Sequence, residues 1–338
     1  MRYTVLFSGG TAPVFAARHS SYRVIPSTMN SLPPCELCPR RCRADRGAGA
    51  IGYCRAGAKA RVYRWGPHSG EEPPISGTRG SGTVFFSHCT LSCLYCQNHP
   101  WSQGDRGETY DTAGLAGILR ELADAGCHNW NLVTPTPWLP QIRAAADTVR
   151  DGGASLPFVY NTSGFERIET VSEYRDLLDI VLTDLRYACA DTASEASGAR
   201  AYVECARSFL KWSCENVGPL ECDGEGIATG GTICRILVLP GHADEAVANL
   251  EWMADNVGTD VAVSLMAQYT PVHRAAATSG WNRRITREEY DRVVERLDDL
   301  GFENGWVQEL DDADPGAFLG EDMAAGRGTP PPSNTPPL

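Results

Sequence analysis

The stretch Cys89-Thr-Leu-Ser-Cys93-Leu-Tyr-Cys96-Gln-Asn98 contains three cysteines with the spacing C-x3-C-x2-C. It closely follows the apolar run Thr83-Val-Phe-Phe-Ser87, which predicts a buried strand. A compact loop at the end of a strand can direct three sulfurs at one centre. Thiolates are the usual ligands of iron–sulfur clusters, and three protein ligands on a [4Fe–4S] cube leave one iron open for a small molecule. The spacing therefore predicts a [4Fe–4S] cluster held by Cys89, Cys93 and Cys96.

A structural zinc loop is the alternative interpretation of these three cysteines. Zinc prefers four tetrahedral ligands, often arranged as paired C-x2-C knuckles. Here the fourth ligand would have to be His88 or His99, neither of which belongs to such a pair. The cluster interpretation is therefore favoured.

A second group of cysteines lies nearer the N-terminus, in Cys35-Glu-Leu-Cys38-Pro-Arg-Arg-Cys42 and at Cys54. Its spacing, C-x2-C-x3-C-x11-C, predicts a second metal site. Four thiolates saturate either a zinc ion or an iron–sulfur cluster, so both identities stay open. Such a site would be structural or would relay electrons. The alternative is a loop of free thiols packed against the core.

Composition limits the class of protein. The chain has 338 residues, a formal net charge of −12 and a pI near 5.1. This acidic balance argues against a nucleic-acid partner, which needs a basic surface. The 13 cysteines are grouped like metal ligands rather than like a disulfide framework, so a reducing cytoplasmic location is expected. No apolar run is long enough to span a membrane, and no membrane partner is expected.

From residue 83 onward, strand patterns alternate with helical patterns. Six strands are expected, at 83–87, 129–134, 157–161, 179–184, 233–239 and 261–266. Helices are expected at 112–125, 139–151, 166–178, 243–256 and 286–299, with another at 199–213 inside a polar insertion at 187–230. Short strands separated by helices imply βαβ units and a parallel sheet, hence an α/β fold.

Four regions are expected along the chain: a poorly ordered leader at 1–30, a cysteine-rich N-terminal module and linker at 31–78, a β/α core at 79–312, and a disordered Pro-rich tail at 313–338. The Gly/Pro-rich stretch at 66–82 is interpreted as a connector. The alternative places this stretch across the mouth of a site, with His68 and Glu72 contacting substrate. Six further cysteines lack compact spacing and are expected to be buried thiols: Cys127, Cys189, Cys205, Cys214, Cys222 and Cys234.

Several stretches resemble one family. They are Cys35–Cys42, the run from Glu71 to Gly82, Cys96-Gln-Asn98, Asn131-Leu-Val-Thr-Pro-Thr136, Tyr160-Asn-Thr-Ser-Gly164 and Met266-Ala-Gln-Tyr269. Over about residues 35–300 the chain looks like the radical S-adenosylmethionine (SAM) superfamily, and within it like relatives of pyruvate formate-lyase activating enzyme. The resemblance implies a partial (β/α)6 TIM-type barrel. It also implies a [4Fe–4S] cluster whose open iron binds SAM, and cleavage of SAM to a 5′-deoxyadenosyl radical.

The resemblance also implies a set of cofactor-binding residues. Tyr95 matches the aromatic residue beside the adenine. Asn161, Thr162 and Asp184 match positions that hold SAM and a monovalent cation. Where the superfamily has Gly-Gly-Glu-Pro, this chain has Thr134-Pro-Thr-Pro137, so Thr134 and Thr136 are expected to take over contacts to SAM.

Three more positions match residues that face the cofactor: Arg235, Gln268 and Tyr269. Arg186 replaces the family's lysine and is expected to clamp a carboxylate. Two of these assignments have structural alternatives. Asp184 could cap the turn after its strand, and Arg235 could be a satisfied arginine of the barrel interior.

The resemblance favours an activase-like enzyme whose partner is a protein carrying a glycine to be converted to a radical. A mutase, lyase or modifying enzyme acting on a small-molecule substrate is the alternative. Either would need a reducing partner such as flavodoxin or ferredoxin. A third hypothesis is a non-catalytic metal-binding or electron-carrying protein, which would not need a SAM pocket.

Overall fold

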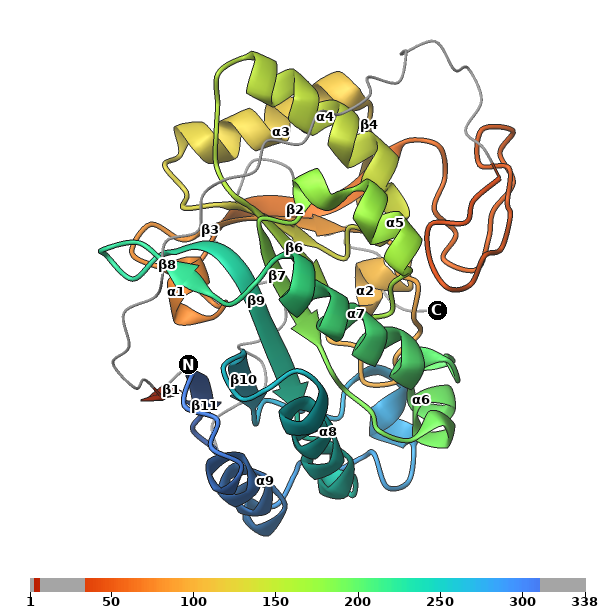
Figure 1. Cartoon of the computed structure of the whole chain (residues 1–338). Helices are drawn as coiled ribbons and strands as arrows, with labels where there is room; N and C mark the ends of the chain where they lie inside the picture. Colours follow the sequence, from red (N-terminus) through yellow and green to blue (C-terminus); the bar gives the residue numbers. More distant parts are fainter. Residues whose placement is uncertain (1–2, 7–33, 311–338) are drawn as a thin grey trace, which may run out of the picture.

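The computed structural model describes residues 3–6 and 34–310 (Figure 1). Within the expected leader at 1–30, Tyr3–Leu6 forms strand β1, which pairs antiparallel with β11 (Gly305–Gln308) near the other end of the described chain. The rest of that leader and the expected tail at 313–338 lie outside the described residues.

One curved sheet organises the molecule, with the strand order β1-β11-β10-β9-β7-β6-β5-β3-β2-β4 and the short β8 paired to β9. The remaining strands are β2 (Ala60–His68), β3 (Ser81–Phe86), β4 (Glu108–Tyr110), β5 (Trp130–Val133), β6 (Phe158–Thr162), β7 (Ile180–Asp184), β8 (Glu221–Cys222), β9 (Ala228–Leu237) and β10 (Ala262–Met266). From β3 through β11 along this order the neighbours are parallel. The α/β fold class is therefore confirmed, as an open barrel-like sheet.

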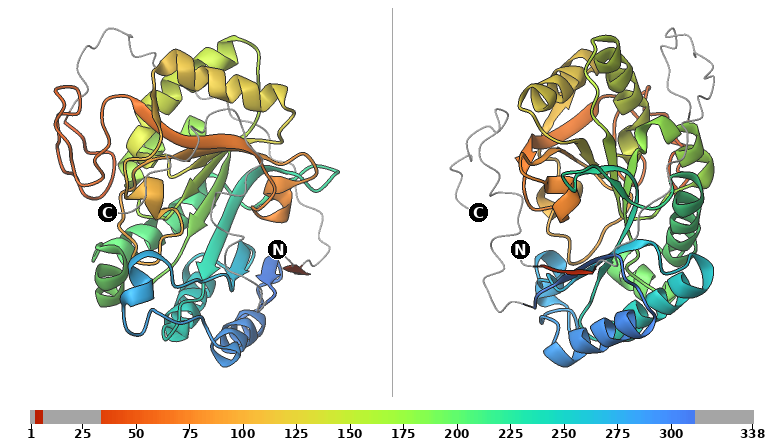
Figure 2. Two further views of the ribbon diagram at one scale, coloured as in Figure 1. Left: turned by 180° about the vertical axis from the view of Figure 1, so that it is seen from behind. Right: turned by 60° about the vertical axis from the view of Figure 1, so that its left-hand side comes forward.

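The long helices lie outside the curve of the sheet, as the two views of Figure 2 show. The helices are α1 (Pro73–Ser76), α2 (His99–Ser102), α3 (Thr112–Asp124), α4 (Leu139–Asp151), α5 (Ile168–Glu173), α6 (Ala190–Ser197), α7 (Tyr202–Asn216), α8 (Ala243–Asn256) and α9 (Arg287–Asp299), with 3₁₀ turns η1 (Thr136–Trp138), η2 (Arg175–Leu177) and η3 (His273–Ala277). The helix expected at 166–178 is replaced by α5 and η2. The insertion at 187–230 contains two helices rather than one.

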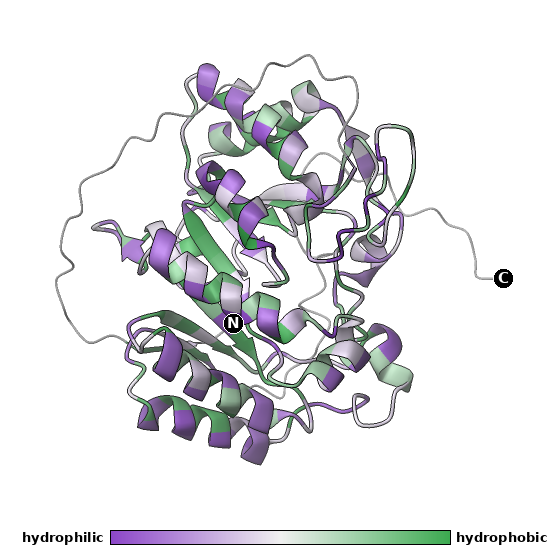
Figure 3. Ribbon diagram, turned by 45° about the vertical axis from the view of Figure 1, so that its right-hand side comes forward, coloured by the Kyte–Doolittle hydropathy of each residue, from purple (hydrophilic) through white to green (hydrophobic). Residues whose placement is uncertain are grey.

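Two faces of each parallel strand serve two different purposes. Every second residue of these strands, such as Val84, Leu132 and Tyr160, packs against the helices in an apolar layer. The residues between them point into the barrel, because successive side chains of a strand alternate between faces. Figure 3 shows the apolar strands between helices whose outer surfaces are polar.

The barrel interior is itself divided. Its N-terminal end is filled by an apolar cluster that includes Ile75, Ile180, Ile233 and Trp306. Its C-terminal end carries polar and sulfur-containing side chains around a cavity. This is the end at which β/α barrels place their chemistry.

The stretch expected to be a connector, 66–82, is instead part of the barrel. It holds the end of β2, the whole of α1 and the start of β3. Strand β2 pairs antiparallel with β3, for example Trp65 with Val84. This stretch was misjudged because its Gly and Pro residues mark the ends of short elements as well as loops.

Burial of the scattered cysteines is mixed. Cys127 and Cys234 are buried as expected, but Cys189 and Cys222 are exposed. Cys189 directly precedes α6, and Cys222 lies on the short β8, so neither is enclosed by the helical layer. Among residues 3–6 and 34–310, we find no helix with the length and apolar character needed to cross a bilayer.

Candidate functional site

A cavity of about 260 Å³ opens at the C-terminal ends of the parallel strands. Its wall is contributed by the loop after β3 and by strands β6, β7, β9 and β10, together with the segment before α1. The lining residues used below are Glu71, Cys89, Cys93, Tyr95, Cys96, Thr134, Asn161, Thr162, Asp184, Arg186, Arg235, Gln268 and Tyr269. The cavity thus brings together residues up to about 200 positions apart in the sequence.

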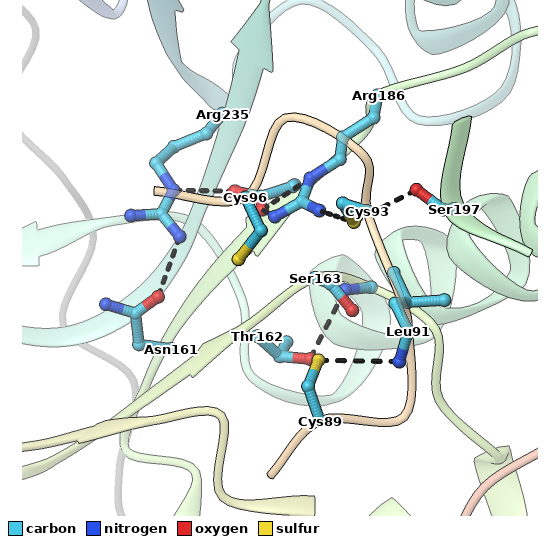
Figure 4. Close-up of polar contacts among 12 residues, drawn as sticks. Cys89, Leu91, Cys93, Cys96, Asn161, Thr162, Ser163, Arg186, Ser197 and Arg235 are labelled. Atoms are coloured by element: carbon cyan, nitrogen blue, oxygen red, sulfur yellow. Dashed lines mark hydrogen bonds and ion pairs between the residues drawn. The ribbon is translucent and has the colours of Figure 1, made fainter. Parts of the chain in front are cut away.

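The three cysteines of the loop after β3 all line this cavity (Figure 4). Cys93 is buried, whereas Cys89 and Cys96 are partly exposed. Among the described residues, no three Cys, His, Asp or Glu side chains already converge on one metal position. The loop therefore places its sulfurs along one cavity without closing them on a single point, and the cluster at these cysteines stays a prediction.

The sulfur of Cys93 accepts two hydrogen bonds. Arg186 Nη1 donates to Cys93 Sγ over 3.2 Å, and Ser197 Oγ donates over 3.0 Å. Figure 4 shows the sulfur between these two donors. Arginine carries only donors, so the sulfur acts here as the acceptor. A thiolate ligand of a metal cluster has this acceptor character, and the residues present fit such a group.

The other two thiols are disfavoured as free thiolates. Burial raises the pKa of Cys89 well above its ordinary value, with the neighbouring Cys93 adding to the effect. Burial likewise raises the pKa of Cys96 to about 11. Metal binding requires deprotonated sulfur and supplies the positive charge that offsets this cost. The environment therefore suits sulfur bound to a cationic centre better than free thiolate.

The cysteine loop is fixed by the insertion at 187–230. The Ser92 N–H donates to the Ser197 carbonyl over 3.2 Å, and the Leu94 N–H donates to the Ala196 carbonyl over 2.8 Å. On the other side of the loop, the Ala275 N–H donates to the Leu94 carbonyl over 2.8 Å. The end of α6 and the turn η3 therefore hold the loop backbone from two directions.

Asp184 lies at the end of β7 between two arginines. Arg235 Nε donates to Asp184 Oδ1 over 2.7 Å, and Arg186 Nε donates to Asp184 Oδ2 over 3.0 Å. Burial alone would raise the pKa of Asp184, but Arg235 and Arg186 lower it below the ordinary value. The carboxylate that Arg186 clamps is thus that of its own chain. A monovalent cation at Asp184 stays a prediction, because both oxygens here accept from guanidinium groups.

Asn161 and Glu71 extend this network. Arg235 Nη2 donates to Asn161 Oδ1 over 2.7 Å, and Arg235 Nη1 lies 3.5 Å from Glu71 Oε2. The amides of Asn131 and Asn161 donate to Glu71 Oε1 over 3.1 and 3.3 Å. Arg235 is therefore both a satisfied interior arginine and a residue of the cavity wall.

Glu71 is the site residue that sequence reasoning missed. The neighbouring Glu72 was considered as a substrate contact, yet Glu72 is buried and does not line the cavity. His68, considered with it, does line the cavity. The signal for Glu71 was the run from Glu71 to Gly82, but sequence alone could not say which of two adjacent glutamates faces inward.

The threonines after β5 and β6 have different roles from those expected. Thr134 lines the cavity and has φ 61°, a left-handed conformation that is unfavourable for a β-branched residue. Thr136 and Thr162 instead donate their hydroxyls to Glu166 Oε1. Thr136 is buried and is absent from the cavity wall, so its expected contact to SAM finds no support here. Thr162 reaches the wall while its hydroxyl points to Glu166.

Glu166 is a buried carboxylic acid next to the cavity wall. Burial raises its pKa to about 7, although hydrogen bonds from Thr136, Thr162 and Tyr160 oppose the shift. Its second oxygen, Oε2, has no partner among the described residues. At neutral pH the side chain is therefore partly protonated.

Tyr95 belongs to an aromatic group beside the cysteine loop. Its hydroxyl lies 2.6 Å from that of Tyr187, and its ring stacks on Trp281 with centroids 5.8 Å apart. The Tyr187 hydroxyl lies 2.5 Å from Ser197 Oγ, which donates to the sulfur of Cys93. Tyr269, on the cavity wall, packs at 5.4 Å from the Tyr95 ring. Tyr95 therefore presents a rigid aromatic surface to the cavity.

The two histidines considered as zinc ligands do not line the cavity. His88 is buried, with its ring 5.9 Å from that of Trp138, and burial lowers its pKa to about 4. His99 Nδ1 lies 3.0 Å from the Cys96 carbonyl, and its ring stacks on His273. The cavity does contain Gln268, whose buried Oε1 has no hydrogen-bond partner among the described residues.

The four N-terminal cysteines lie away from this cavity, since none of them lines it. They belong to residues 34–59, which precede β2 and contain no helix or strand. In Figure 1 this segment is the red and orange loop at the edge of the molecule beside α5.

Comparison with known proteins identifies one matching family model. Residues 76–199 match the model of a 4Fe–4S single cluster domain. This segment contains Cys89, Cys93 and Cys96 but not the N-terminal cysteines. The match agrees with an iron–sulfur cluster at the loop whose three thiols line the cavity.

A full-length comparison finds an uncharacterized protein of Methanocaldococcus jannaschii, 26% identical over 276 residues, covering 79% of this chain and 75% of that protein. Among solved structures, a domain of a pyruvate-formate lyase-activating enzyme from Bacteroides vulgatus is 13% identical, with a TM-score of 0.35, covering 59% of this chain and 91% of the other. SuiB of Streptococcus suis is 14% identical, with a TM-score of 0.42, covering 65% of this chain and 47% of the other.

Proposed function

We propose that this chain is a radical SAM enzyme, with a [4Fe–4S] cluster held by Cys89, Cys93 and Cys96 and SAM bound in the adjoining cavity. The observation that carries the proposal is that three thiols of one strand-end loop line a single cavity, and that the sulfur of Cys93 already accepts two hydrogen bonds. In this proposal the chain would hold a reduced cluster and SAM so that they could supply a 5′-deoxyadenosyl radical for hydrogen abstraction from a substrate carbon.

The chain's own residues bind and orient these groups. Tyr95 offers a rigid aromatic wall beside the loop, and Asn161 and Arg235 are held at fixed positions on the same wall. Asp184 positions Arg235 and Arg186 by accepting from both. Gln268 brings an unpaired buried oxygen that can accept a hydrogen bond from a ligand. Such fixed groups lower the cost of ordering a cofactor.

An activase-like role is the finer part of the proposal, with a glycine-bearing loop of a partner protein as substrate. A second cavity, of about 700 Å³, supports it. Gly70 and Glu71 line both cavities, and Val5 and Trp306 line the second. An extended polypeptide bound in the second cavity would therefore contact a segment that also forms part of the wall of the first. Flavodoxin or ferredoxin would supply the electron.

A small-molecule substrate is the second candidate. The observation that favours it is the charged set Glu71, Asp184 and Arg235 in a cavity of only about 260 Å³. Opposite charges fixed in a small cavity are suited to a polar molecule with both acidic and basic groups. The activase-like role requires the partner polypeptide to enter the second cavity, whereas a small-molecule substrate does not need to enter it.

The test of the common proposal is anaerobic reconstitution with iron and sulfide, reduction, and measurement of 5′-deoxyadenosine formed from SAM. The full chain is expected to form it, and Cys89→Ala/Cys93→Ala/Cys96→Ala is expected to form none. Cys189→Ala, which removes an exposed thiol outside the site, serves as the matched control and should retain the activity. An intact, reducible cluster without SAM cleavage would refute the catalytic proposal.

The substrate class is tested separately. A pyruvate formate-lyase, as a glycyl radical enzyme of the class that the resemblance implies, would be mixed with the reduced, SAM-loaded protein, and a glycyl radical sought by electron paramagnetic resonance. Val5→Trp, which narrows only the second cavity, should abolish that signal while sparing SAM cleavage without partner. Retention of the partner's radical in this variant would count against entry through the second cavity.

A further inference from the structure

The segment with the four N-terminal cysteines folds back on itself through backbone hydrogen bonds. The Cys35 N–H donates to the Ala44 carbonyl over 3.0 Å, and the Arg43 N–H donates to the Cys35 carbonyl over 2.8 Å. The Arg41 N–H also donates to the Cys38 carbonyl over 3.0 Å. These bonds place Cys42 beside Cys35, with its sulfur 4.0 Å from the Cys35 carbonyl oxygen.

The later part of the segment returns to Cys42 at Gly52. A Cβ atom added at Gly52 would lie 2.3 Å from the sulfur of Cys42, so the backbone at Gly52 comes close to this thiol. The Arg55 N–H donates to the Gly52 carbonyl over 3.0 Å, which turns the chain at Cys54. Cys54 follows Gly52 by two positions, so this turn brings it toward Cys42. Cys38 lies between Cys35 and Cys42 in the part of the segment that folds back on itself.

A buried cation accompanies the four thiols. Arg46 is only 4% exposed, and its Nη1 lies 4.0 Å from the sulfur of Cys35. The same guanidinium donates to the carbonyls of Gly57 and Pro137 over 2.6 and 2.7 Å. A centre bound by four thiolates carries excess negative charge, which a fixed guanidinium nearby offsets.

We propose that Cys35, Cys38, Cys42 and Cys54 bind a second metal centre through four thiolates, and that this centre braces the loop of Cys89–Cys96. The shared chemistry is four-thiolate ligation, which serves zinc and iron–sulfur clusters alike. All 13 cysteines are free thiols in the structure, and residues 34–59 have no helix or strand to fix them. A metal bound by cysteines from the earlier and the later part of such a segment stabilises its fold directly.

The proposed bracing rests on two contacts between the N-terminal cysteine segment and the loop of Cys89–Cys96. Arg40, between two of the cysteines, donates from Nε to the Thr90 carbonyl over 3.1 Å. The hydroxyl of Tyr53, next to Cys54, lies 2.9 Å from Ser92 Oγ. The Arg40 guanidinium also stacks 3.7 Å above the Tyr53 ring, so the two contacts form one unit. Thr90 and Ser92 are neighbours of Cys89 and Cys93, the ligands of the proposed catalytic cluster.

The first experiment measures metal in the full chain carrying Cys89→Ala/Cys93→Ala/Cys96→Ala. This variant lacks the proposed catalytic cluster, so the result does not depend on SAM cleavage. We expect about one zinc per chain, or iron with matching sulfide and visible absorption, and the metal found distinguishes the two sources. Adding Cys35→Ser and Cys54→Ser should remove it, whereas adding Cys189→Ser should not. Absence of both metals, or metal that survives Cys35→Ser/Cys54→Ser, would overturn the proposal.

A second measurement needs no change at the four cysteines. Cys42 and Cys189 are both exposed, so neither is shielded by burial. In the triple variant as isolated, Cys42 is expected to resist alkylation, and a strong chelator should speed its alkylation while leaving that of Cys189 unchanged. An alkylation rate of Cys42 that the chelator does not change would contradict metal ligation at Cys42.

The bracing is tested by hydrogen exchange in the same triple variant. The amides of Ser92 and Leu94 donate to the insertion, so their exchange reports on the position of the loop. Removing the metal should speed their exchange at least about tenfold, as expected when a hydrogen-bonding contact is lost. The amide of Val293, in the middle of α9, is the internal reference and should not change. Unchanged exchange at Ser92 and Leu94 would refute the bracing.

Discussion

The hydroxyl of Ser197 lies 3.0 Å from the sulfur of Cys93, although the two residues are 104 positions apart. Ser197 ends α6, the helix of the insertion whose backbone also holds the cysteine loop. Arg186 approaches the same sulfur over 3.2 Å. The insertion therefore contributes both to the position of the loop and to the electrostatic environment of one proposed cluster ligand.

Replacing Ser197 with alanine should make the reduction potential of the reconstituted cluster more negative. A hydrogen bond to a thiolate favours the more negative, reduced state of a cluster. Loss of one bond to a charged group is worth about 1.5 kcal/mol, or about 60 mV for a one-electron couple. Tyr187 keeps Tyr95 as a partner in this variant. The potential would be measured by a redox titration followed by electron paramagnetic resonance.

The matched control for this change is Ser194→Ala, an exposed serine of the same helix. Its potential should equal that of the parent protein. If Ser197→Ala and Ser194→Ala gave the same potential, the hydrogen bond to Cys93 would have no effect on the cluster.

Asp184→Asn should destabilise the folded protein by on the order of 3 kcal/mol, because it removes the carboxylate partner of the partly buried Arg186 and the closer of the two carboxylates at Arg235. Chemical denaturation of the two proteins would measure the difference in the free energy of unfolding. Asp191→Asn is the control, since Asp191 pairs with Arg200 at the exposed surface. It should have no measurable effect, because exposed ion pairs contribute little.

The effect of Asp184 has a defined pH dependence. Its pKa is lowered in the folded state, so the carboxylate stabilises the fold above the unfolded value of about 3.9. That stabilisation is lost as the pH falls through the lower folded value. The difference between the parent protein and Asp184→Asn should therefore be constant near neutrality and shrink in acid. A difference that grew in acid would contradict the assigned pairing.

Glu166→Gln should stabilise the protein increasingly as the pH rises. The pKa of Glu166 is raised from 4.5 to about 7 by burial, so ionisation of this carboxyl costs the folded state more than the unfolded state. The parent protein therefore loses stability between about pH 4.5 and 7, and the glutamine variant lacks this loss. Relative to the parent, the variant should gain on the order of 3 kcal/mol across that range. Denaturation at several pH values measures it.

Glu173→Gln, on the exposed surface of α5, is the control for this series. Its stability should follow that of the parent protein at every pH. A flat difference for Glu166→Gln across the range would mean that Glu166 is ionised in the fold throughout.

The six central strands and the cysteine loop could be predicted because their signals are local. Apolar runs such as Thr83–Ser87 mark buried parallel strands, and the spacing of Cys89, Cys93 and Cys96 specifies three ligands within one turn of chain. The alternation of strands and helices then implied that the loop lies at the C-terminal end of the sheet, where the structure has it. These predictions required no knowledge of distant contacts.

The residues that were missed depend on contacts over long stretches of sequence. Glu71 is fixed by Arg235, 164 positions away, and Ser197 by a cysteine loop 104 positions away. Arg186 was expected to hold a carboxylate, but its partner turned out to be Asp184 on the same strand end. Sequence shows which groups can pair, whereas only the fold decides which of them meet.

Thr134 lines the cavity in a left-handed conformation, with φ 61°, and this strain predicts an unusual response to substitution. A β-branched residue in this conformation costs of order 1–3 kcal/mol, whereas glycine adopts it freely. Thr134→Gly should therefore leave the free energy of unfolding unchanged or raise it by about 1 kcal/mol. Thr148→Gly, the same change at an exposed helical position of α4, should lower it because glycine disfavours a helix interior. If both variants were destabilised equally, the conformation of Thr134 would carry no strain. If Thr134→Gly is stable but binds SAM more weakly in a calorimetric titration, the threonine at this strained position is retained for the ligand rather than for the fold.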